Sequence, residues 1–302
     1  IDFQLGFRGE ETISDGKQLA NDSSFTRNYF NLFPSTFLNW AVDSSHTLNF
    51  SYSRRIDRPG YGELNPFLFI VSPVMYNAGN PFLHPQISDN FELTHVYKGI
   101  LSVTLGYLHM TDVFMTFPHQ DDSTHIFYNR TENFPTYNSA SALGSVSWPV
   151  TSWFTTVTAV TVFYDHYFGS LTGGGFDRSQ WTWIVNSDNI ITLKRNWSAE
   201  VSLFYRSLNR NGIWLEQPLY GLNCGVRKNF AGGKGTVAVN FNDILWRTYV
   251  NGTAIYQDAN TVVRGNFDSR RVYISFSWKF GRSQYQRDTT KKSGEDEMNR
   301  AK

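Results

Sequence analysis

The chain has 302 residues, carries 27 Lys and Arg against 26 Asp and Glu, and contains one cysteine, Cys224. The balanced charge gives no overall field that would attract a nucleic acid, and a single cysteine excludes an intramolecular disulfide or a cysteine-based zinc cluster. No run approaches the roughly 18 consecutive apolar residues of a membrane helix. Aromatic residues make up 17% of the chain, which suits strands and also a protein whose rings lie at membrane interfaces.

The N-terminal part of the chain is predicted to form three strands. Apolar and polar residues alternate from Phe3 to Phe7, and a polar stretch from about Ile13 to Phe25 is predicted to be a loop. A long strand follows from about Tyr29 to Val42, Asp43-Ser44-Ser45 favours a tight turn, and alternation resumes from Leu48 to Tyr52. Since no signal peptide precedes this pattern, we expect either a processed N-terminus or the C-terminal part of a longer chain.

The next segment, Arg58 to Gln86, interrupts the strands. It holds five prolines and several aromatic residues, and proline cannot donate to the ladder of a central strand. The segment is therefore predicted to be a long structured loop. Alternating runs on either side of Lys98-Gly99 then predict two strands joined by a short turn.

Short and long connections largely alternate along the chain. The predicted short turns are Asp43 to Ser45, Lys98-Gly99, Pro149 to Ser152, Lys194 to Asn196 and Phe230 to Lys234. The predicted long connections are Ile13 to Phe25, Arg58 to Gln86, Phe117 to Thr124, Phe168 to Asp177 and Val250 to Phe267. Between these connections lie about twelve antiparallel strands. A short link on the long-loop side, Asn209 to Gly212, is the exception.

Strand length separates two architectures. A soluble sandwich uses strands of about 5 to 6 residues, whereas a membrane-spanning barrel strand needs about 9 to 11. The runs Trp153 to Phe168 and Trp197 to Arg210 are longer than a sandwich strand. The sequence therefore favours an all-β, antiparallel transmembrane β-barrel, with a soluble β-sandwich as the alternative.

The last strand and the end of the chain differ sharply in composition. From Asp268 to Gly281 apolar and polar residues alternate, whereas Arg282 to Lys302 mixes six Lys or Arg with four Asp or Glu and has few large apolar residues. We expect a barrel segment over residues 1–281 and a disordered, charged tail over residues 282–302.

Two further sets of residues fit a barrel in a membrane. Aromatic residues beside the short turns are predicted to form an interfacial girdle, namely Trp40, Trp148, Trp153, Trp197 and Phe230. Polar residues on the other face of the strands are predicted to line a water-filled interior, namely Asn49, Ser51, Thr104, Glu200, Ser202, Asn240 and Asn242.

Several motifs, taken in order, resemble the outer-membrane β-barrel proteins of the TonB-dependent receptor superfamily. The resemblance covers essentially the whole chain and depends on the series of motifs, since no single piece is specific. The motifs are Ser53 to Pro59, Leu64 to Phe67, Gly79 to Pro85, Asn90 to Leu93, Gly235-Thr236, Asn242 to Ile244 and Arg270 to Gly281.

This resemblance implies a fold, partners and a location. Members have a barrel of about 22 strands, so a chain with about twelve would be the C-terminal half, its wall completed by the remaining strands and an N-terminal plug. The implied function is uptake of an extracellular ligand, driven by a TonB-type energy-coupling protein that acts through the plug. The implied location is the outer membrane of a Gram-negative bacterium, with outer-membrane lipid around the barrel, long loops extracellular and the tail periplasmic. A passive porin or a non-transporting adhesin or structural barrel is the alternative.

No catalytic motif stands out, and we expect neither an enzyme nor a cofactor. Phe230 to Thr236 lacks the Gly-Lys-Ser/Thr order of a phosphate loop and is predicted to be a turn. Asp165-His166 supplies half of an acid-base pair for a barrel-embedded enzyme but lacks a serine partner. The weak metal candidates are His119, Asp121, Asp122 and His125, although a flexible polar loop tip is the favoured interpretation of this cluster.

The Arg58 to Gln86 segment is the better candidate for ligand binding, because loops on a rigid scaffold often carry recognition. Its rings and amides are suited to contact a ligand, although packing of the segment onto the barrel rim is the competing explanation. The candidate residues are Tyr61, Asn65, Phe67, Phe69, Tyr76, Asn77 and Asn80.

Overall fold

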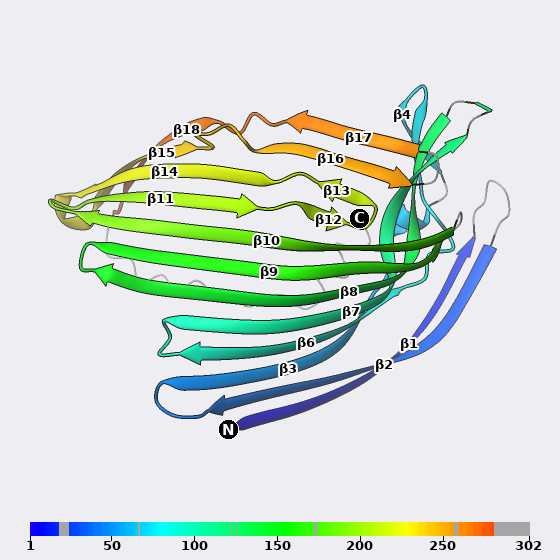
Figure 1. The fold of residues 1–302 in the computed structure, drawn as a ribbon, viewed down its shortest axis with the longest axis horizontal. Helices are drawn as coiled ribbons and strands as arrows, with labels where there is room; N and C mark the ends of the chain where they lie inside the picture. The colour runs from blue at the N-terminus through cyan, green and yellow to red at the C-terminus, as the bar shows by residue number, and fades with distance from the viewer. Residues whose placement is uncertain are drawn as a thin grey trace.

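The computed structural model describes residues 1–17, 24–65, 67–121, 123–124, 126–171, 174–256 and 259–280. The expected tail, residues 282–302, lies outside them. Twelve strands follow one antiparallel path in chain order and form a curved, open trough (Figure 1). They are β1 (Asp2–Lys17), β2 (Ser24–Ala41), β3 (His46–Asp57), β6 (Gln86–Tyr97), β7 (Leu101–Asp121), β8 (Ile126–Thr151), β9 (Phe154–Leu171), β10 (Gly174–Leu193), β11 (Trp197–Arg206), β14 (Leu219–Phe230), β15 (Gly235–Asn242) and β18 (Arg271–Trp278). The predicted all-β antiparallel architecture is confirmed.

A second, four-stranded sheet prolongs the last strands of the path. It consists of β12 (Asn209–Asn211), β13 (Trp214–Glu216), β16 (Tyr249–Tyr256) and β17 (Ala259–Asn266). Between β15 and β16 the chain leaves the ladder at Asp243, whose carboxylate accepts hydrogen bonds from the backbone N–H of Arg247 at 3.0 Å and of Thr248 at 3.1 Å. This local turn satisfies backbone groups that the ladder would otherwise satisfy. The predicted loop Val250 to Phe267 is therefore wrong, because most of it is the hairpin β16–β17.

Three other predicted loops are also wrong in extent. The pairing of β1 with β2 continues to Lys17 and Ser24, so most of Ile13 to Phe25 is strand. Likewise, β7 extends to Asp121 and the β9–β10 ladder to Leu171 and Gly174, so much of Phe117 to Thr124 and of Phe168 to Asp177 is strand. The polar and glycine-rich sequence of these stretches lacks apolar alternation, although the backbone ladder continues through them.

The predicted short turns lie at one end of the trough, on the left in Figure 1. Four of them are confirmed, whereas the third is displaced to residues 152–153 because β8 continues to Thr151. At the first turn, Asp43 Oδ1 accepts hydrogen bonds from the N–H groups of Ser45 at 2.6 Å and His46 at 2.9 Å. At the next, Lys98 and Gly99 both have positive φ, which suits a tight reversal between two strands. The turn after β14 contains the short helix η1 (Ala231–Gly233).

The concave face is identified by contacts between strands that are far apart along the path. Tyr167 of β9 packs in one buried group with Phe117 of β7 and Tyr256 of β16, which only the inner side of the curved sheet can bring together. Tyr164 and Trp181 pair on the alternate face, with ring centroids 5.0 Å apart. The alternate face is therefore convex, and it leaves Trp181 58% exposed, as a lipid-facing ring would be.

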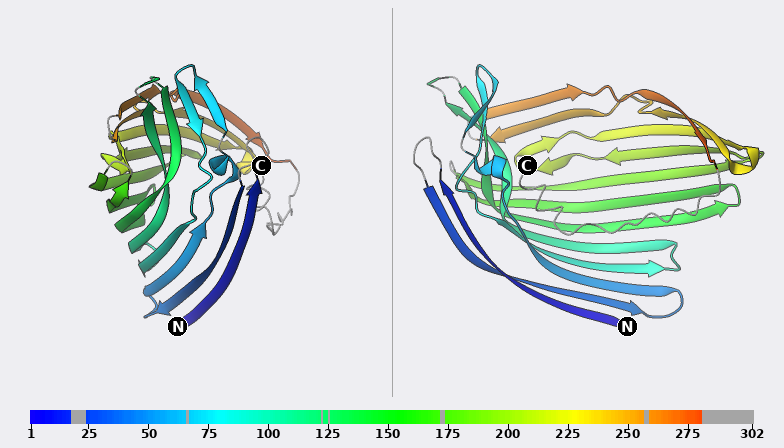
Figure 2. Two further views of the ribbon diagram at one scale, coloured as in Figure 1. Left: turned by 90° about the vertical axis from the view of Figure 1, so that its right-hand side faces the viewer. Right: turned by 180° about the vertical axis from the view of Figure 1, so that it is seen from behind.

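The buried apolar core lies at the long-loop end of the trough. There the outer arms of β7 and β8 bend across toward β16 and β17 (Figure 2). Phe117 and Phe134 have no exposed surface. The whole group comprises Met115, Phe117, Phe134, Tyr167, Ile213, Ala254 and Tyr256. This core joins the two halves of the sheet at its mouth.

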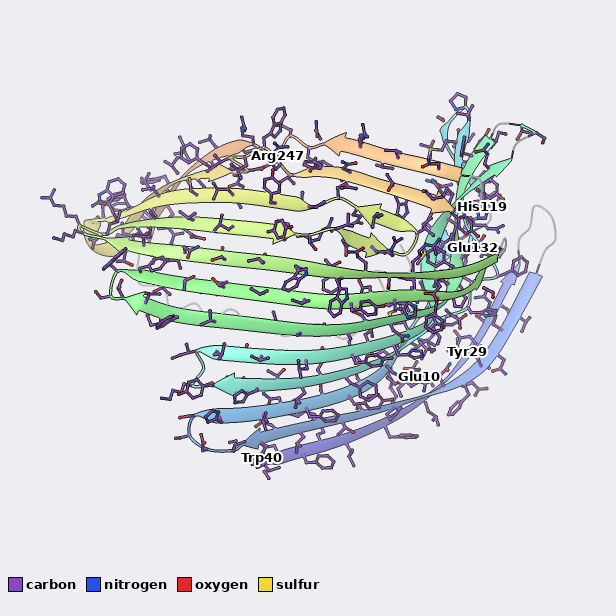
Figure 3. All side chains as sticks on the ribbon, in the orientation of Figure 1. Glu10, Tyr29, Trp40, His119, Glu132 and Arg247 are labelled. Atoms are coloured by element: carbon purple, nitrogen blue, oxygen red, sulfur yellow. The ribbon has the colours of Figure 1, made fainter. Side chains whose placement is uncertain are left out.

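Four of the predicted girdle residues are exposed tryptophans. Trp40, Trp148, Trp153 and Trp197 are exposed and lie beside short turns, and Trp40 is at that end of the trough in Figure 3. Among the described residues, no helix is both long and apolar enough to cross a membrane.

Candidate functional site

The Arg58 to Gln86 segment contains three short elements, α1 (Tyr61–Leu64), β4 (Leu68–Ser72) and β5 (Met75–Ala78). Strand β5 pairs in parallel with β8, from Met75 opposite Phe127 to Ala78 opposite Arg130. That edge of β8 is available because β9 pairs with β8 only as far as Thr136. The predicted structured loop is thus seated against the protruding arm of β8.

A close backbone approach fixes the start of the segment. The Glu63 carboxylate accepts a hydrogen bond from the N–H of Gly60 at 2.8 Å, closing the first turn of α1. Asn80 donates its backbone N–H to the carbonyl oxygen of Glu63 at 2.6 Å. Between them, a Cβ on Gly79 would lie 2.1 Å from the carbonyl oxygen of Asn65. Only glycine at position 79 allows its backbone to lie this close to the backbone of Asn65.

Two asparagines pin the end of the segment to β8. The side chain of Asn80 donates to the carbonyl oxygen of Thr131 at 3.1 Å and accepts from the N–H of Phe82 at 3.0 Å. Asn133 accepts from the N–H of His84 at 2.7 Å and donates to the carbonyl oxygens of His84 and Asp112, both at 2.8 Å. The side chains of Asn80 and Asn133 therefore form hydrogen bonds to backbone groups that hold the segment in place.

A hollow of about 310 Å³ lies between the segment and the arms of β7 and β8. Of the predicted ligand-binding residues, it brings together Phe67, Phe69 and Asn77. Asn129 of β8 donates its side-chain amide to that of Asn77 at 3.2 Å across the wall. The other four predicted residues are not among those that line it; Tyr61 is 75% exposed.

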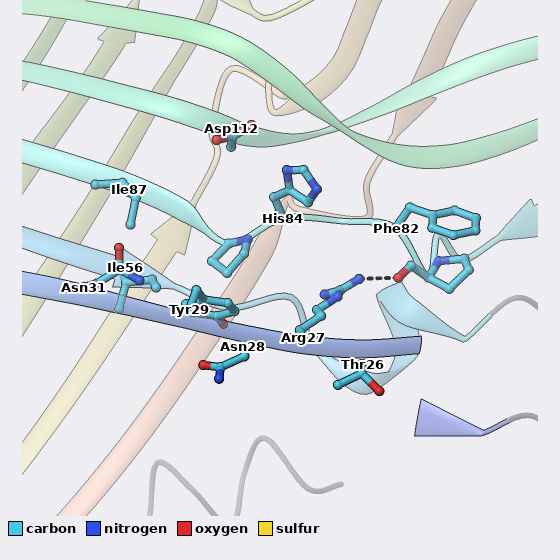
Figure 4. Close-up of a pocket in the computed structure, with 12 residues that line it drawn as sticks. Thr26, Arg27, Asn28, Tyr29, Asn31, Ile56, Phe82, His84, Ile87 and Asp112 are labelled. Carbon is cyan, nitrogen blue, oxygen red and sulfur yellow. Dashed lines mark hydrogen bonds between the residues drawn. The ribbon is translucent and has the colours of Figure 1, made fainter. Parts of the chain in front are cut away.

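A larger hollow of about 580 Å³ lies on the other side of the segment, against β2 (Figure 4). Arg27, Tyr29 and Asn31 project from one face of β2 into this hollow, which Phe82 and His84 also line. Arg27 donates a hydrogen bond to the carbonyl oxygen of Pro81. The volumes of both hollows fall within the roughly 300 to 1,000 Å³ of small-molecule sites. The larger hollow is lined by a cation, a phenol, an amide and an imidazole.

These β2 residues were not predicted from the sequence. Their period-two spacing was available as a signal, but the expected loop Ile13 to Phe25 and strand start at Tyr29 placed Arg27 outside a strand. Nearby, Arg58 donates to Glu10 Oε2 at 2.8 Å and Thr12 Oγ1 at 2.9 Å, tying the start of the segment to β1.

The weak metal candidates do not come together in the described residues. His119 Nε2 lies 3.0 Å from Glu132 Oε1, and its ring stacks on Tyr128 with centroids 4.9 Å apart. Asp122 and His125 lie outside the described residues, as does the side chain of Asp121. Where the structure describes the chain, no group of three or more His, Cys, Asp or Glu is placed to hold a metal ion.

Glu132 and His119 form a polar contact far out on the arms of β8 and β7, at the long-loop end of the trough (Figure 3). The hydrogen bond from His119 and the neighbouring Arg130 guanidinium, whose Nε lies 3.0 Å away, lower the pKa of the Glu132 carboxyl. The site therefore favours a carboxylate here.

The two residues of the predicted acid-base pair, Asp165 and His166, contact different partners in the structure. Asp165 accepts a hydrogen bond from the Tyr137 hydroxyl at 2.7 Å, whereas His166 Nε2 lies 2.8 Å from Asp177 Oδ1. Because successive side chains of a strand point to opposite faces, Asp165 and His166 do not act on one substrate together.

Comparisons with known proteins agree with this architecture. A family model described as "outer membrane protein beta-barrel family" matches residues 1–278. The search of curated protein sequences gives no match.

Solved structures with a similar fold include a siderophore receptor, a ferric enterobactin receptor and an iron transporter. The siderophore receptor PirA of Pseudomonas aeruginosa superposes with a TM-score of 0.59 and 12% identity, covering 91% of this chain and 46% of PirA. The ferric enterobactin receptor PfeA of the same organism, in complex with enterobactin, gives 0.58 and 14%, covering 85% and 42%. The FrpB iron transporter of Neisseria meningitidis gives 0.60 and 13%, covering 92% and 43%. The chain thus spans less than half the length of these proteins.

Proposed function

Because the chain belongs to the outer membrane protein beta-barrel family, we propose that it forms part of the wall of a receptor that takes up an extracellular ligand. It lies in the outer membrane and has the fold of the barrels of siderophore receptors, in line with the predicted relation to TonB-dependent receptors. The long-loop end faces outward, and the short turns face the periplasm.

The observation that carries this proposal is the pair of hollows on either side of the Arg58 to Gln86 segment. Both lie at the long-loop end, and both are backed by strands instead of by free loops. Asn80 and Asn133 hold the segment to β8 by their side chains. A recognition surface held in this way loses little conformational entropy when a ligand binds.

The whole receptor would contain more than this chain. An N-terminal plug and further strands would complete the barrel, since the chain covers 46% of PirA. A TonB-type partner would supply energy through the plug. We propose that binding and passage involve no covalent chemistry.

Uptake by the full-length protein tests the proposal. Cells that carry it as their sole receptor would be given ferric enterobactin and other ferric siderophores. Enterobactin is the compound bound in the PfeA structure. We expect saturable uptake that stops when a protonophore dissipates the proton gradient. The double variant Phe69→Ala with Asn77→Ala should lower uptake, while Phe91→Ala, at a position that lines neither hollow, should not.

A passive pore or an adhesin gives a different result. Uptake through a pore would rise linearly with concentration and would persist with the protonophore, and an adhesin would give none for any ferric siderophore. Either outcome would contradict the receptor assignment.

A further inference from the structure

Two adjoining short turns carry an unusual concentration of positive charge. They join β10 to β11 and β14 to β15, and Asn229 donates its backbone N–H to the carbonyl oxygen of Asn196 at 3.0 Å. Beside them, the N–H of Lys279 donates to the carbonyl oxygen of Lys234 at 2.8 Å. We call the cations gathered here the basic corner: Lys194, Arg195, Lys228, Lys234 and Lys279.

No carboxylate balances these cations in the local sequence. Residues 191–199, 226–238 and 276–280 contain six Lys and Arg and no Asp or Glu. Four members of the basic corner are exposed, and Lys228 is half-buried. By contrast, the turn at residues 42–45 carries Asp43, the turn at residues 98–100 carries Lys98 alone, and the turn at residues 152–153 carries no charge. The charge is therefore concentrated at one part of the rim.

Large aromatic rings lie directly beside the basic corner on the convex face. Lys228 Nζ lies 5.1 Å from the centroid of the Trp197 ring, and it also donates a hydrogen bond to the carbonyl oxygen of Arg195. The rings of Phe230 and Trp278 are 5.9 Å apart, and Phe276 is 67% exposed. Such rings favour the boundary between acyl chains and headgroups.

The order of residues along the strands matches the layers of a phospholipid leaflet. Exposed apolar side chains such as Phe276 and Ile274 come first, Trp197 and Trp278 follow toward the turn, and the cations lie at the turn itself. In a bilayer the same order runs from acyl chains through the interface to the phosphates. Lysine and arginine reach such phosphates by extending their apolar stems along the interface.

We propose that the basic corner binds the headgroups of anionic glycerophospholipids and so holds this part of the barrel in the phospholipid leaflet. Charge complementarity selects the anionic lipid, because an excess of cations near a surface attracts phosphates that have no compensating choline or amine. The rings position the cations at phosphate depth. This proposal concerns contact with lipid, so its failure would not contradict the proposal that the protein takes up a ligand.

Lipid selectivity of the full-length protein provides the test. Reconstituted protein would be titrated with spin-labelled phosphatidylglycerol or phosphatidylcholine, and the immobilised fraction of each lipid compared. A variant with Lys194→Gln, Arg195→Gln, Lys234→Gln and Lys279→Gln keeps the Lys228–Trp197 contact. We expect it to lower the preference for phosphatidylglycerol about fivefold.

A charge-conserving variant supplies the matched control. Lys194→Arg, Arg195→Lys, Lys234→Arg and Lys279→Arg should retain the preference, because headgroup attraction depends on charge. In the unmodified protein, the preference should also fall as salt is raised. An unchanged preference in the glutamine variant, its loss in the charge-conserving variant, or insensitivity to salt would each overturn the proposal. The last measurement needs no variant and so remains decisive if a variant fails to fold.

Discussion

Asn133→Asp tests whether the Arg58 to Gln86 segment depends on its anchor to β8. The change keeps the size of the side chain and the acceptor for the N–H of His84 but removes the two hydrogen bonds donated to the carbonyl oxygens of His84 and Asp112. Of these two bonds, only the one to His84 joins the segment to β8, because Asp112 lies on β7. One net hydrogen bond contributes about 1 kcal/mol, so the local opening equilibrium of the segment should rise about fivefold.

Amide hydrogen exchange over residues 79–86 measures this opening directly. We expect exchange there to accelerate about fivefold, while exchange in the β9–β10 ladder stays unchanged. Asn260→Asp is the control, since Asn260 is exposed on β17. If the protection of residues 79–86 is the same in Asn133→Asp and Asn260→Asp, the anchor does not hold the segment, and the argument from a rigid recognition surface fails.

Three further changes test separate parts of the structure. Phe134→Ala removes a fully buried ring from the apolar core at the long-loop end. It should lower the free energy of unfolding by about 3 to 5 kcal/mol, measured by denaturant titration in micelles. A loss below about 1 kcal/mol would show that this core is not tightly packed. Gly79→Ala forces a Cβ against backbone and should displace the segment, seen as faster proteolysis, whereas Gly62→Ala meets nothing within 4 Å and should not. The lowered pKa of Glu132, caused first by the His119 hydrogen bond, gives stability that is complete above the ordinary carboxyl pKa and is lost as pH falls through the lowered value. Glu132→Gln should therefore flatten the acid side of the stability profile, and an unchanged profile would contradict this assignment.

The membrane-spanning part of the fold was predictable because lipid imposes a strict pattern on it. Leu203 and Tyr205 fall on the convex face of β11, whereas Ser202 lies on the other. The short turns were predictable for a related reason, since few residues tolerate a tight reversal. The outer arms were not, because their polar and glycine-rich sequence lacks the period-two signal while the backbone ladder persists.

The candidate site was only partly predictable. Proline and aromatic content identified the Arg58 to Gln86 segment, since no regular central strand accommodates it. The different roles of the asparagines in this segment could not be predicted, because an asparagine that binds a ligand and one that bonds to the backbone are the same residue type. Asn77 lies at a hollow, whereas Asn80 bonds to the backbone of Thr131 and Phe82. The contribution of Arg27 and Tyr29 depends on a strand more than fifty residues from His84, which local pattern cannot reveal.

The central claim is that the trough stands in the outer membrane with its long-loop end outside. Single substitutions Phe69→Cys, on the Arg58 to Gln86 segment, and Lys98→Cys, at a short turn, would be made in a Cys224→Ser background and treated with a membrane-impermeant maleimide. In intact cells we expect label at position 69 and none at position 98, and label at both once the outer membrane is permeabilised. Labelling of position 98 in intact cells, with position 69 protected, would contradict the account.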